Sequence, residues 1–321
     1  MVLPLSCNLM PETAVQDLVG IAVQAESLGF GRCWVYDEGL ATRDVYVTLT
    51  AIGLATEHIR IGTGITNPYV RHPGATAAAV ATLDELTGGR AFVGLGAGGG
   101  LTLGPLGIEA ARPLTAVRET IGALRALFAG KTVDLEGEEF SLHGARLGYA
   151  RPDIEIILAG RGPRMTRLGG ELADRFLLSY LHKDVLGDTV SMLRSVHETD
   201  SKPFNVTYST FIATNELELE QARAQLTFRL IDSPQRVKDL IGMSEEDTVS
   251  IRTALAGGGP HAAAHLVKEE WVPHFVIVGT PQEAGFELRS LMERYGFDEF
   301  QLPVHELDGA AAKLEQVAAM F

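Results

Sequence analysis

Short apolar segments recur along the chain, separated by glycine-rich or polar loops and by stretches whose apolar residues return every three or four positions. Most of the apolar segments are continuous rather than alternating, which is typical of parallel strands that are buried on both faces. Nine segments predict strands: Val2–Leu5, Cys33–Tyr36, Ile59–Ile61, Ala91–Leu95, Ile154–Leu158, Phe176–Leu178, Val206–Ile212, Phe275–Val278 and Phe300–Leu302.

Helix signals lie between these segments. Val15, Leu18, Val19, Ala22 and Ala25 form one apolar stripe at helical spacing. The run 280–283, Thr-Pro-Gln-Glu, predicts a helix start with a capping box, and the Gly-Gly pair at 88–89 predicts a helix end. Regular alternation of strands and helices indicates a parallel sheet with right-handed crossovers.

The number of strands favours a closed sheet. Nine candidates at this spacing predict an α/β fold, a (β/α)8 TIM barrel with one extra strand, Phe275–Val278, which lies in the long interval between Ile212 and Phe300. That interval also contains three helical patterns, at 217–228, 235–241 and 245–256. We therefore expect a single barrel domain over 1–321 with a helical insertion over 214–272. Within it, Gly257–Pro260 predicts either a lid hinge or a plain connection between helices.

Composition excludes several classes of protein. The 27 lysine and arginine residues are outnumbered by 41 aspartate and glutamate residues, a net charge of −14 that argues against nucleic acid as a partner. No stretch of about 18 uncharged apolar residues is present to span a membrane. Cys7 and Cys33 are too few for a disulfide framework and should be buried as small apolar residues. The first residues lack the features of a signal peptide, so we expect a cytoplasmic protein.

In such a barrel the active site lies in the loops after the strands, and two of these loops are rich in glycine. Gly160, Arg161, Gly162, Pro163 and Arg164 combine a helix start with two arginines, which favours phosphate binding; solvated arginines on a turn are the alternative. Gly94–Gly100 lacks the spacing of a dinucleotide fingerprint. Its glycines would let the backbone approach a flat ligand, or simply form a flexible loop.

The most distinctive segment is 63–73, TGITNPYVRHP, where a glycine beside isoleucine suggests a bulge at the end of the third strand. Together with the residues that follow, to position 98, it resembles the bacterial luciferase-like monooxygenase superfamily. The NPYVRHP run is similar to the coenzyme F420-dependent branch, which includes methylenetetrahydromethanopterin reductase. Segments 157–178 and 278–304 resemble the same family, whereas 213–272 shows little resemblance.

The resemblance implies a barrel that binds a flavin-like ring in its mouth. The family has a non-prolyl cis peptide behind the ring, at the position of Gly64–Ile65. It also implies cofactor contacts from two segments and a phosphate site in a third; these candidates are Gly64, Ile65, Thr66 and Asn67, then Gly96, Ala97 and Gly98, and finally the loop 160–164. F420 is the expected cofactor and FMN the alternative. The corresponding functions are F420-dependent hydride transfer to or from a small molecule, an FMN-dependent monooxygenase, and a non-catalytic flavin-binding barrel.

Three residues are candidates for proton transfer. Asp37 and Glu38 follow the second strand, where burial would raise a carboxyl pKa; a helix-capping pair is the alternative. His182 follows the sixth strand, and its alternative is a surface loop histidine. His261 and His265 have a spacing that can bind zinc but no glutamate between them, so no metal site is expected.

We also expect a homodimer. The alanine-rich stretch 75–81 could pack against a second copy of the chain, or equally against the barrel.

Overall fold

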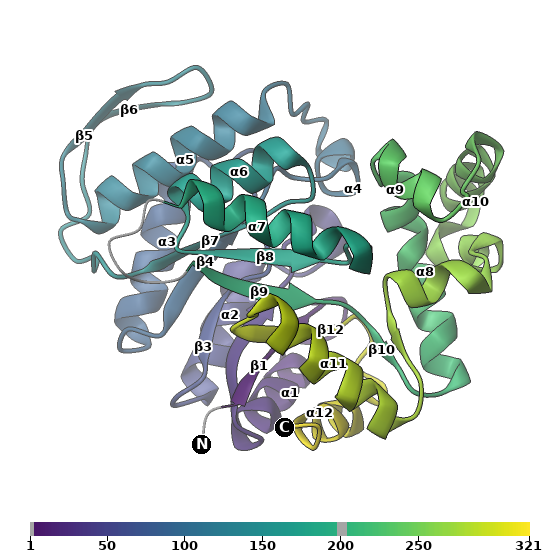
Figure 1. Ribbon diagram of the computed structural model, residues 1–321. Coiled ribbons are helices and arrows are strands. Elements are labelled where there is room, and N and C mark those ends of the chain that lie inside the picture. Colours follow the sequence, from purple (N-terminus) through teal and green to yellow (C-terminus); the bar gives the residue numbers. More distant parts are fainter. Residues whose placement is uncertain (1–2, 198–203) are drawn as a thin grey trace.

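The computed structural model describes residues 3–197 and 204–321, and it shows a closed barrel of parallel strands surrounded by helices (Figure 1). Around the barrel the strand order is β1-β12-β9-β8-β7-β4-β3-β2, and β1 closes the ring by pairing with both β12 and β2. The strands are β1 Leu3–Leu9, β2 Phe30–Val35, β3 Arg60–Thr63, β4 Ala91–Leu95, β7 Glu155–Ala159, β8 Arg175–Ser179, β9 Asn205–Ser209 and β12 Glu299–Val304. The predicted (β/α)8 barrel is thus confirmed.

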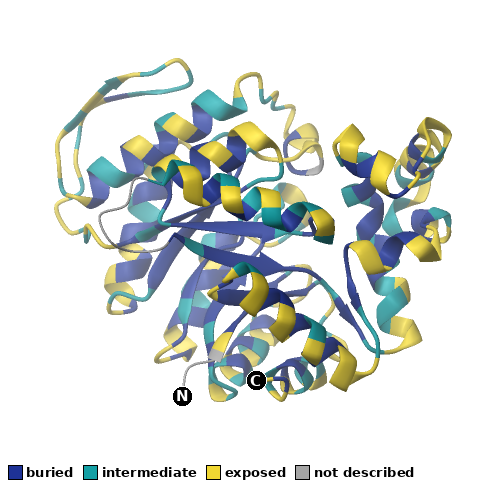
Figure 2. Cartoon of the chain, viewed as in Figure 1, coloured by how far each residue is buried: buried dark blue, intermediate teal, exposed yellow. Residues whose placement is uncertain are grey.

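Helices connect successive strands and cover the outside of the barrel (Figure 2). They are α1 Val15–Ser27, α2 Val45–Ala55, α3 Pro73–Leu86, α5 Pro113–Phe128, α6 Pro163–Leu172, α7 Leu186–Val196, α11 Pro281–Tyr295 and α12 Ala310–Ala318. Short helical segments occupy the loops: α4 Gly100–Leu103, η1 Gly39–Ala41, η2 Gly104–Leu106 and η3 Lys183–Val185. Among these described residues, no helix combines the length and apolar character that crossing a membrane requires.

The first strand is longer than its apolar segment predicts. Val2 lies outside the described residues, and β1 continues from Leu3 to Leu9 through the polar Ser6 and Asn8. Both polar residues are buried and bonded inside the barrel: Ser6 Oγ donates to Glu299 at 2.7 Å, and Asn8 Nδ2 donates to the Gly64 carbonyl at 2.7 Å. Internal hydrogen bonds therefore allow polar residues where the pattern predicts the strand to end.

The helical insertion lies beside the barrel mouth and has its own apolar core (Figure 1). It contains α8 Glu216–Ile231, α9 Gln235–Leu240, α10 Glu245–Ala263, η4 Ala264–Leu266 and η5 Glu269–His274. The predicted strand over 206–212 divides, because the chain leaves the barrel after β9 and forms β10, Ile212–Ala213. β10 pairs with β11, Ile277–Val278, which is the extra strand and lies outside the barrel as predicted.

The glycine run in the insertion joins two helical segments within the range of α10, and it kinks at Gly259, whose φ of 74° is not helical and which precedes Pro260. The structure therefore agrees with a connection between helices, the second of the two alternatives. The sequence also gave no sign of one hairpin, β5 Val133–Glu136 and β6 Ser141–Ala145, which is partly exposed and projects from the barrel between α5 and β7. A hairpin without a continuous buried apolar run lacks the pattern on which the strand predictions rest.

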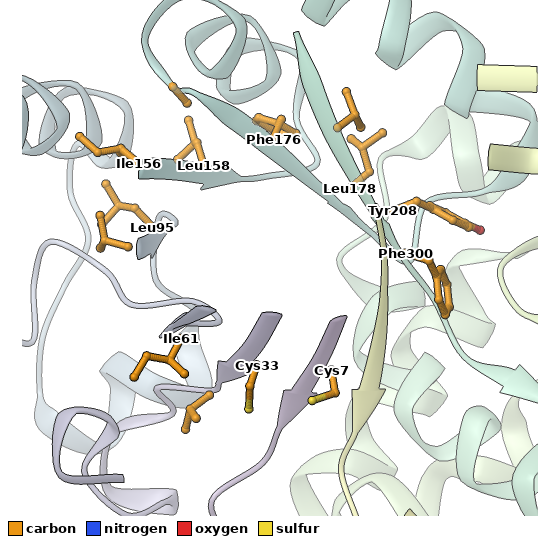
Figure 3. Packing of buried hydrophobic residues seen from close by; sticks show 14 of the residues in the cluster. Cys7, Cys33, Ile61, Leu95, Ile156, Leu158, Phe176, Leu178, Tyr208 and Phe300 are labelled. Carbon is orange, nitrogen blue, oxygen red and sulfur yellow. The ribbon is translucent and has the colours of Figure 1, made fainter. Parts of the chain in front are cut away.

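The barrel wall separates two apolar layers. Outward-facing side chains, including Cys7, Cys33, Ile61, Phe176 and Phe300, pack under the surrounding helices (Figure 3). Both cysteines are free and buried, as predicted. A smaller cluster lies separately, formed by Trp34, Phe92, Ile157, Ala159 and Leu177, with Ile65 packed against it. The same two-sided burial explains why the strands have continuous apolar sequences.

Below this small cluster, a group of charged side chains fills the N-terminal end of the barrel. Glu155 accepts hydrogen bonds from Arg32 at 2.7 Å and Arg175 at 3.0 Å, and it also pairs with Arg60. Arg32 also pairs with the buried Glu299. Burial alone would raise the pKa of Glu155, but the charges of the three arginines lower it to about 2.

Candidate active site

Loops at the C-terminal end of the barrel bring most of the predicted site residues together. Gly64–Asn67 follow β3, Gly96–Gly98 follow β4 and Gly160–Arg164 follow β7, and these three strands are neighbours in the barrel. Asp37 and Glu38 follow β2, on the other side of β3. The candidate residues therefore form one continuous side of the mouth.

The peptide bond between Gly64 and Ile65 is cis, as the family resemblance implied. Hydrogen bonds hold this bulge on three sides. The Gly64 N–H donates to the Val35 carbonyl at 2.7 Å, and its carbonyl accepts from Asn8 at 2.7 Å. The Thr66 backbone bonds to both Gly94 and Gly96 of the neighbouring strand, at 2.9 Å each. The bulge is thus part of the barrel's hydrogen-bond network.

Glycines in β4 and just after it make room for the bulge. A Cβ on Gly94 would lie 2.2 Å from the Thr63 carbonyl oxygen, and a Cβ on Gly96 would lie 2.2 Å from Ile65 Cδ1. Gly98, with φ of 78°, lies against the Asn67 side chain. The Asn67 amide oxygen accepts from the backbone N–H groups of Tyr69 and Val70. These glycines therefore have a packing role. The sequence alone predicts only a flexible loop or close approach to a ligand for this segment.

Asp37 and Glu38 are half-buried at the mouth and point to different partners. Asp37 accepts from Thr66 Oγ1 of the bulge at 2.6 Å, whereas Glu38 accepts from Thr102 Oγ1 at 2.6 Å. Burial raises the pKa of each carboxyl group, and these hydrogen bonds offset part of the effect. Asp44, rather than either of these residues, caps α2, and Glu38, at the N-cap of η1, makes no side-chain cap bond. Asp37 also interacts with the backbone of Gly39, the first residue of η1.

The loop 160–164 leads into α6. Gly162 is the N-cap and Pro163 the first helical residue, as predicted. No side chain caps this helix start, so the amides of its first turn remain available to a ligand or solvent. Arg161 is half-buried beside it and Arg164 is exposed.

Aromatic side chains form the other side of the mouth, and sequence reasoning missed this group. Tyr36, Tyr180, Phe211 and His305 follow β2, β8, β9 and β12. The ring centroid of His305 lies 5.2 Å from that of Tyr36 and 5.4 Å from that of Phe211, and Phe211 lies 5.1 Å from Tyr180. Tyr180 adopts φ of 53°, and its N–H donates to the Ser209 carbonyl at 2.9 Å. Its hydroxyl lies 3.4 Å from His305 Nε2. Burial, together with the charge of Arg229, lowers the pKa of His305 to about 3, so its imidazole is neutral at pH 7.

A cavity of about 380 Å³ adjoins this aromatic group. It lies between α8 of the insertion and the segment that joins β12 to α12, and both Phe211 and His305 line it. Gln221 and Gln225 of α8 contribute polar side chains to its wall. The mouth therefore extends into a space large enough for part of a small-molecule ligand.

His182 lies apart from the carboxylates. It is 1 % exposed, its Nδ1 accepts from the Asp184 N–H at 3.2 Å, and its ring stacks on His274 of the insertion at 4.8 Å. The surface-loop alternative is therefore wrong. Burial and the neighbouring His274 lower its pKa. These contacts join the barrel to the insertion.

With this geometry in place, comparison with known proteins identifies the family. A family model described as "Luciferase-like monooxygenase" matches residues 4–299. The chain belongs to the luciferase-like monooxygenase family. The resemblance inferred from residues 63–98 is thereby confirmed, and the family match spans nearly the whole barrel.

Individual proteins are also similar to this chain. A 5,10-methylenetetrahydromethanopterin reductase of Methanolobus tindarius is 31% identical over 293 residues, which cover 89% of this chain and 90% of that protein. An F420-dependent glucose-6-phosphate dehydrogenase of Beutenbergia cavernae is 34% identical over 177 residues, 51% of this chain and 52% of that protein. Among solved structures, the coenzyme F420-dependent tetrahydromethanopterin reductase of Methanopyrus kandleri superposes with a TM-score of 0.86 at 24% identity, covering 99% and 98% of the two chains.

Proposed function

We propose that the protein is an F420-dependent oxidoreductase that transfers a hydride to or from a small-molecule substrate. The observation that carries the proposal is the bulge at Gly64–Ile65, held beside Gly96–Gly98 and the arginine-containing loop 160–164 at one side of the barrel mouth. Relatives whose names include F420 dependence support the same cofactor. When bound, the deazaflavin ring of F420 accepts or donates a hydride at its C5.

The residues at the mouth fit such a cofactor. Gly64, Ile65, Thr66 and Asn67 supply a rigid surface behind a flat ring, and Asn8 Oδ1 is buried there without a hydrogen-bond partner among the described residues. Gly96, Ala97 and Gly98 expose backbone beside it. Gly160–Arg164 provide free amides and cationic side chains for a phosphate group.

The carboxylates have separate roles in the proposal. Glu38 holds or moves a proton for the substrate, because its side chain is half-buried and has a raised pKa. Asp37 holds the bulge through Thr66, which places it beside the cofactor surface. His182 is assigned to joining the insertion to the barrel rather than to proton transfer, because it is enclosed by His274 and Phe275.

Equilibrium binding of the purified protein to oxidised F420 and to FMN tests the cofactor, with cofactor fluorescence as the measurement. We expect F420 to bind in the micromolar range or tighter and FMN to bind at least tenfold more weakly. Tight binding of FMN without F420 would instead favour the FMN-dependent monooxygenase. F420 binding without turnover of methylenetetrahydromethanopterin, glucose 6-phosphate or further candidate substrates would favour a non-catalytic barrel.

A homodimer completes the proposal, with α2 as its contact surface. This helix has no charged residue over Val45–Ala55, and Val47 and Leu54 are 64% and 68% exposed on it. A helix that is apolar all round normally has a partner on each side. Ala77 and Ala81 of α3 are buried within the chain, so that part of the alanine-rich stretch packs against the barrel.

The double substitution Val47→Glu/Leu54→Glu is expected to convert a dimer into a monomer of 34.5 kDa, because four carboxylates would face one another in a dry contact. Light scattering coupled to size-exclusion chromatography measures the mass. Phe286→Glu, at an equally exposed apolar residue of α11, is the control and should remain dimeric. A wild-type protein of 34.5 kDa would exclude the dimer.

A further inference from the structure

One face of helix α8 is turned toward the barrel mouth. Glu218, Gln221 and Gln225 line the cavity beside α12 and recur at helical spacing, and Arg229 continues the same stripe. The adjacent stripe of the same helix, Ala222, Leu226 and Leu230, is buried in the core of the insertion. The insertion therefore presents Arg229 to the barrel from a helix that is fixed by its own apolar packing.

Arg229 lies over the mouth, among residues from several barrel strands. Its guanidinium carbon is 4.7 Å from the ring centroid of Tyr180. Burial raises the pKa of Glu38 and the Arg229 charge opposes that rise. The same charge adds to the burial that lowers the pKa of His305. Arg229 is thus electrostatically close to groups that follow β2, β8 and β12.

A second arginine approaches from the loop after β7. Burial, reinforced by the like charge of Arg229, lowers the pKa of Arg161 to about 10. Over residues 3–197 and 204–321, neither guanidinium group has an ion pair within 4.0 Å or a side-chain hydrogen bond. Asp232 is near enough to oppose the shift on Arg161 but makes no such contact. Two unpaired, half-buried guanidinium groups repel one another unless an anion compensates them.

The arginines at the opposite end of the barrel show the contrast. Arg32, Arg60 and Arg175 are also close together, and each is paired with Glu155. At that end of the barrel, the protein compensates clustered guanidinium charge with its own carboxylate. At the mouth, no carboxylate of the described residues lies within 4.0 Å of either guanidinium group, and Glu38 and Asp232 act on these arginines only from a longer distance. Both arginine side chains are partly exposed, so an anion from solution can reach them.

We propose that Arg161 and Arg229 form one oxyanion site at the barrel mouth, which binds a phosphate or carboxylate group, and that the insertion supplies half of it. Planar guanidinium groups suit such oxyanions because they donate paired hydrogen bonds. The source of the anion, but not the existence of the site, rests on the proposed function. The group comes either from the phosphate of F420, through the loop 160–164, or from an acidic substrate held beside Tyr180 and His305.

The site itself is tested without cofactor or turnover, by calorimetric titration with inorganic phosphate. We expect Arg229→Met and Arg161→Met each to weaken phosphate binding at least about tenfold, as loss of charged hydrogen bonds implies. Arg229→Lys keeps the charge but loses the planar guanidinium group that donates paired hydrogen bonds. Its phosphate affinity should therefore lie between those of Arg229→Met and wild type. Arg252→Met removes the same charge from an exposed position on α10 and should bind phosphate like wild type. Unchanged phosphate affinity in folded Arg229→Met would overturn the site.

Binding of F420 and of FO, the deazaflavin core that lacks the phosphate, identifies the source. If the phosphate of F420 occupies the site, Arg229→Met weakens F420 binding about tenfold and leaves FO binding unchanged. If the substrate occupies it, Arg229→Met loses phosphate binding but binds both cofactor forms like wild type. A wild-type protein that binds neither F420 nor FO, yet binds phosphate through Arg229, would refute the proposed function and still support this site.

Discussion

Replacing Glu38 by glutamine is expected to lower kcat for hydride transfer by about 10²–10⁴-fold, which is the usual contribution of a positioned acid or base. The substitution keeps the size of the side chain and its acceptor for Thr102, but removes the titrating proton. Affinity for F420 should remain unchanged, because Glu38 bonds to Thr102 of α4 rather than to the bulge. The change in absorbance between oxidised and reduced F420 follows the reaction.

The pH profile gives a second measurement of the same proposal. Burial raises the pKa of Glu38 above 4.5. The limb of the pH–rate profile in which Glu38 titrates therefore lies above that pH. Substrate reduction requires the protonated acid, so its rate should fall as pH rises through this pKa, and substrate oxidation should show the opposite slope. The limb should vanish in Glu38→Gln.

Two further variants separate proton transfer from positioning. Asp37→Asn should mainly weaken F420 binding, because Asp37 bonds to Thr66 of the bulge. Glu85→Gln, on the exposed face of α3, is the control and should leave both quantities unchanged. If Glu38→Gln keeps wild-type kcat and its pH limb, Glu38 is not the proton donor or acceptor.

Replacing Glu155 by glutamine is expected to lower the free energy of unfolding by about 3–5 kcal/mol, the usual cost of removing one partner from a buried ion pair. Glu155 compensates three arginines that the barrel encloses, and within residues 3–197 and 204–321 Glu299 would remain as the only carboxylate paired with Arg32. Urea denaturation followed by circular dichroism measures the loss. Glu138→Gln breaks an exposed pair with Arg112 and should cost less than about 1 kcal/mol.

The same cluster gives a pH dependence with a defined sign. The pKa of Glu155 is lowered to about 2 in the folded protein, below its ordinary value of 4.5. Its contribution to stability is therefore complete above about pH 4.5 and is lost as pH falls toward 2. Wild type should lose stability over this window more steeply than Glu155→Gln. Parallel curves for the two proteins would show that Glu155 does not carry this stabilisation.

Elements buried on both faces could be predicted from the sequence, and those that depend on tertiary pairing could not. The continuous apolar run Ala91–Leu95 identified β4 because both faces of that strand are covered. The charged end of the barrel gave no signal, because Arg32 and Glu155 are 123 positions apart and meet only when the barrel closes. The partly exposed hairpin β5–β6 lacks the continuous apolar run that identifies a strand buried on both faces.

The candidate site divides in the same way. Gly64–Ile65 and the helix start at Gly162 follow from local sequence, since bulges and helix caps involve neighbouring residues. His305 and Arg229 were missed, although each has a position that could have drawn attention. His305 directly follows a strand, and Arg229 lies on the polar stripe of a helix. Neither position in the sequence shows that the side chain lies at the barrel mouth, because that depends on where the insertion packs.

The attachment of the insertion has a consequence for how such enzymes diversify. Its two ends lie side by side, since Ile212 is paired with Ile277 and Ala213 with Val278, and its helices bury their own apolar core. Sequence changes between these strands can therefore accumulate, in evolution or in a chimera, with little strain on the barrel. A lineage could exchange the half of the mouth that the insertion supplies while it inherits the bulge and glycines of the other half unchanged.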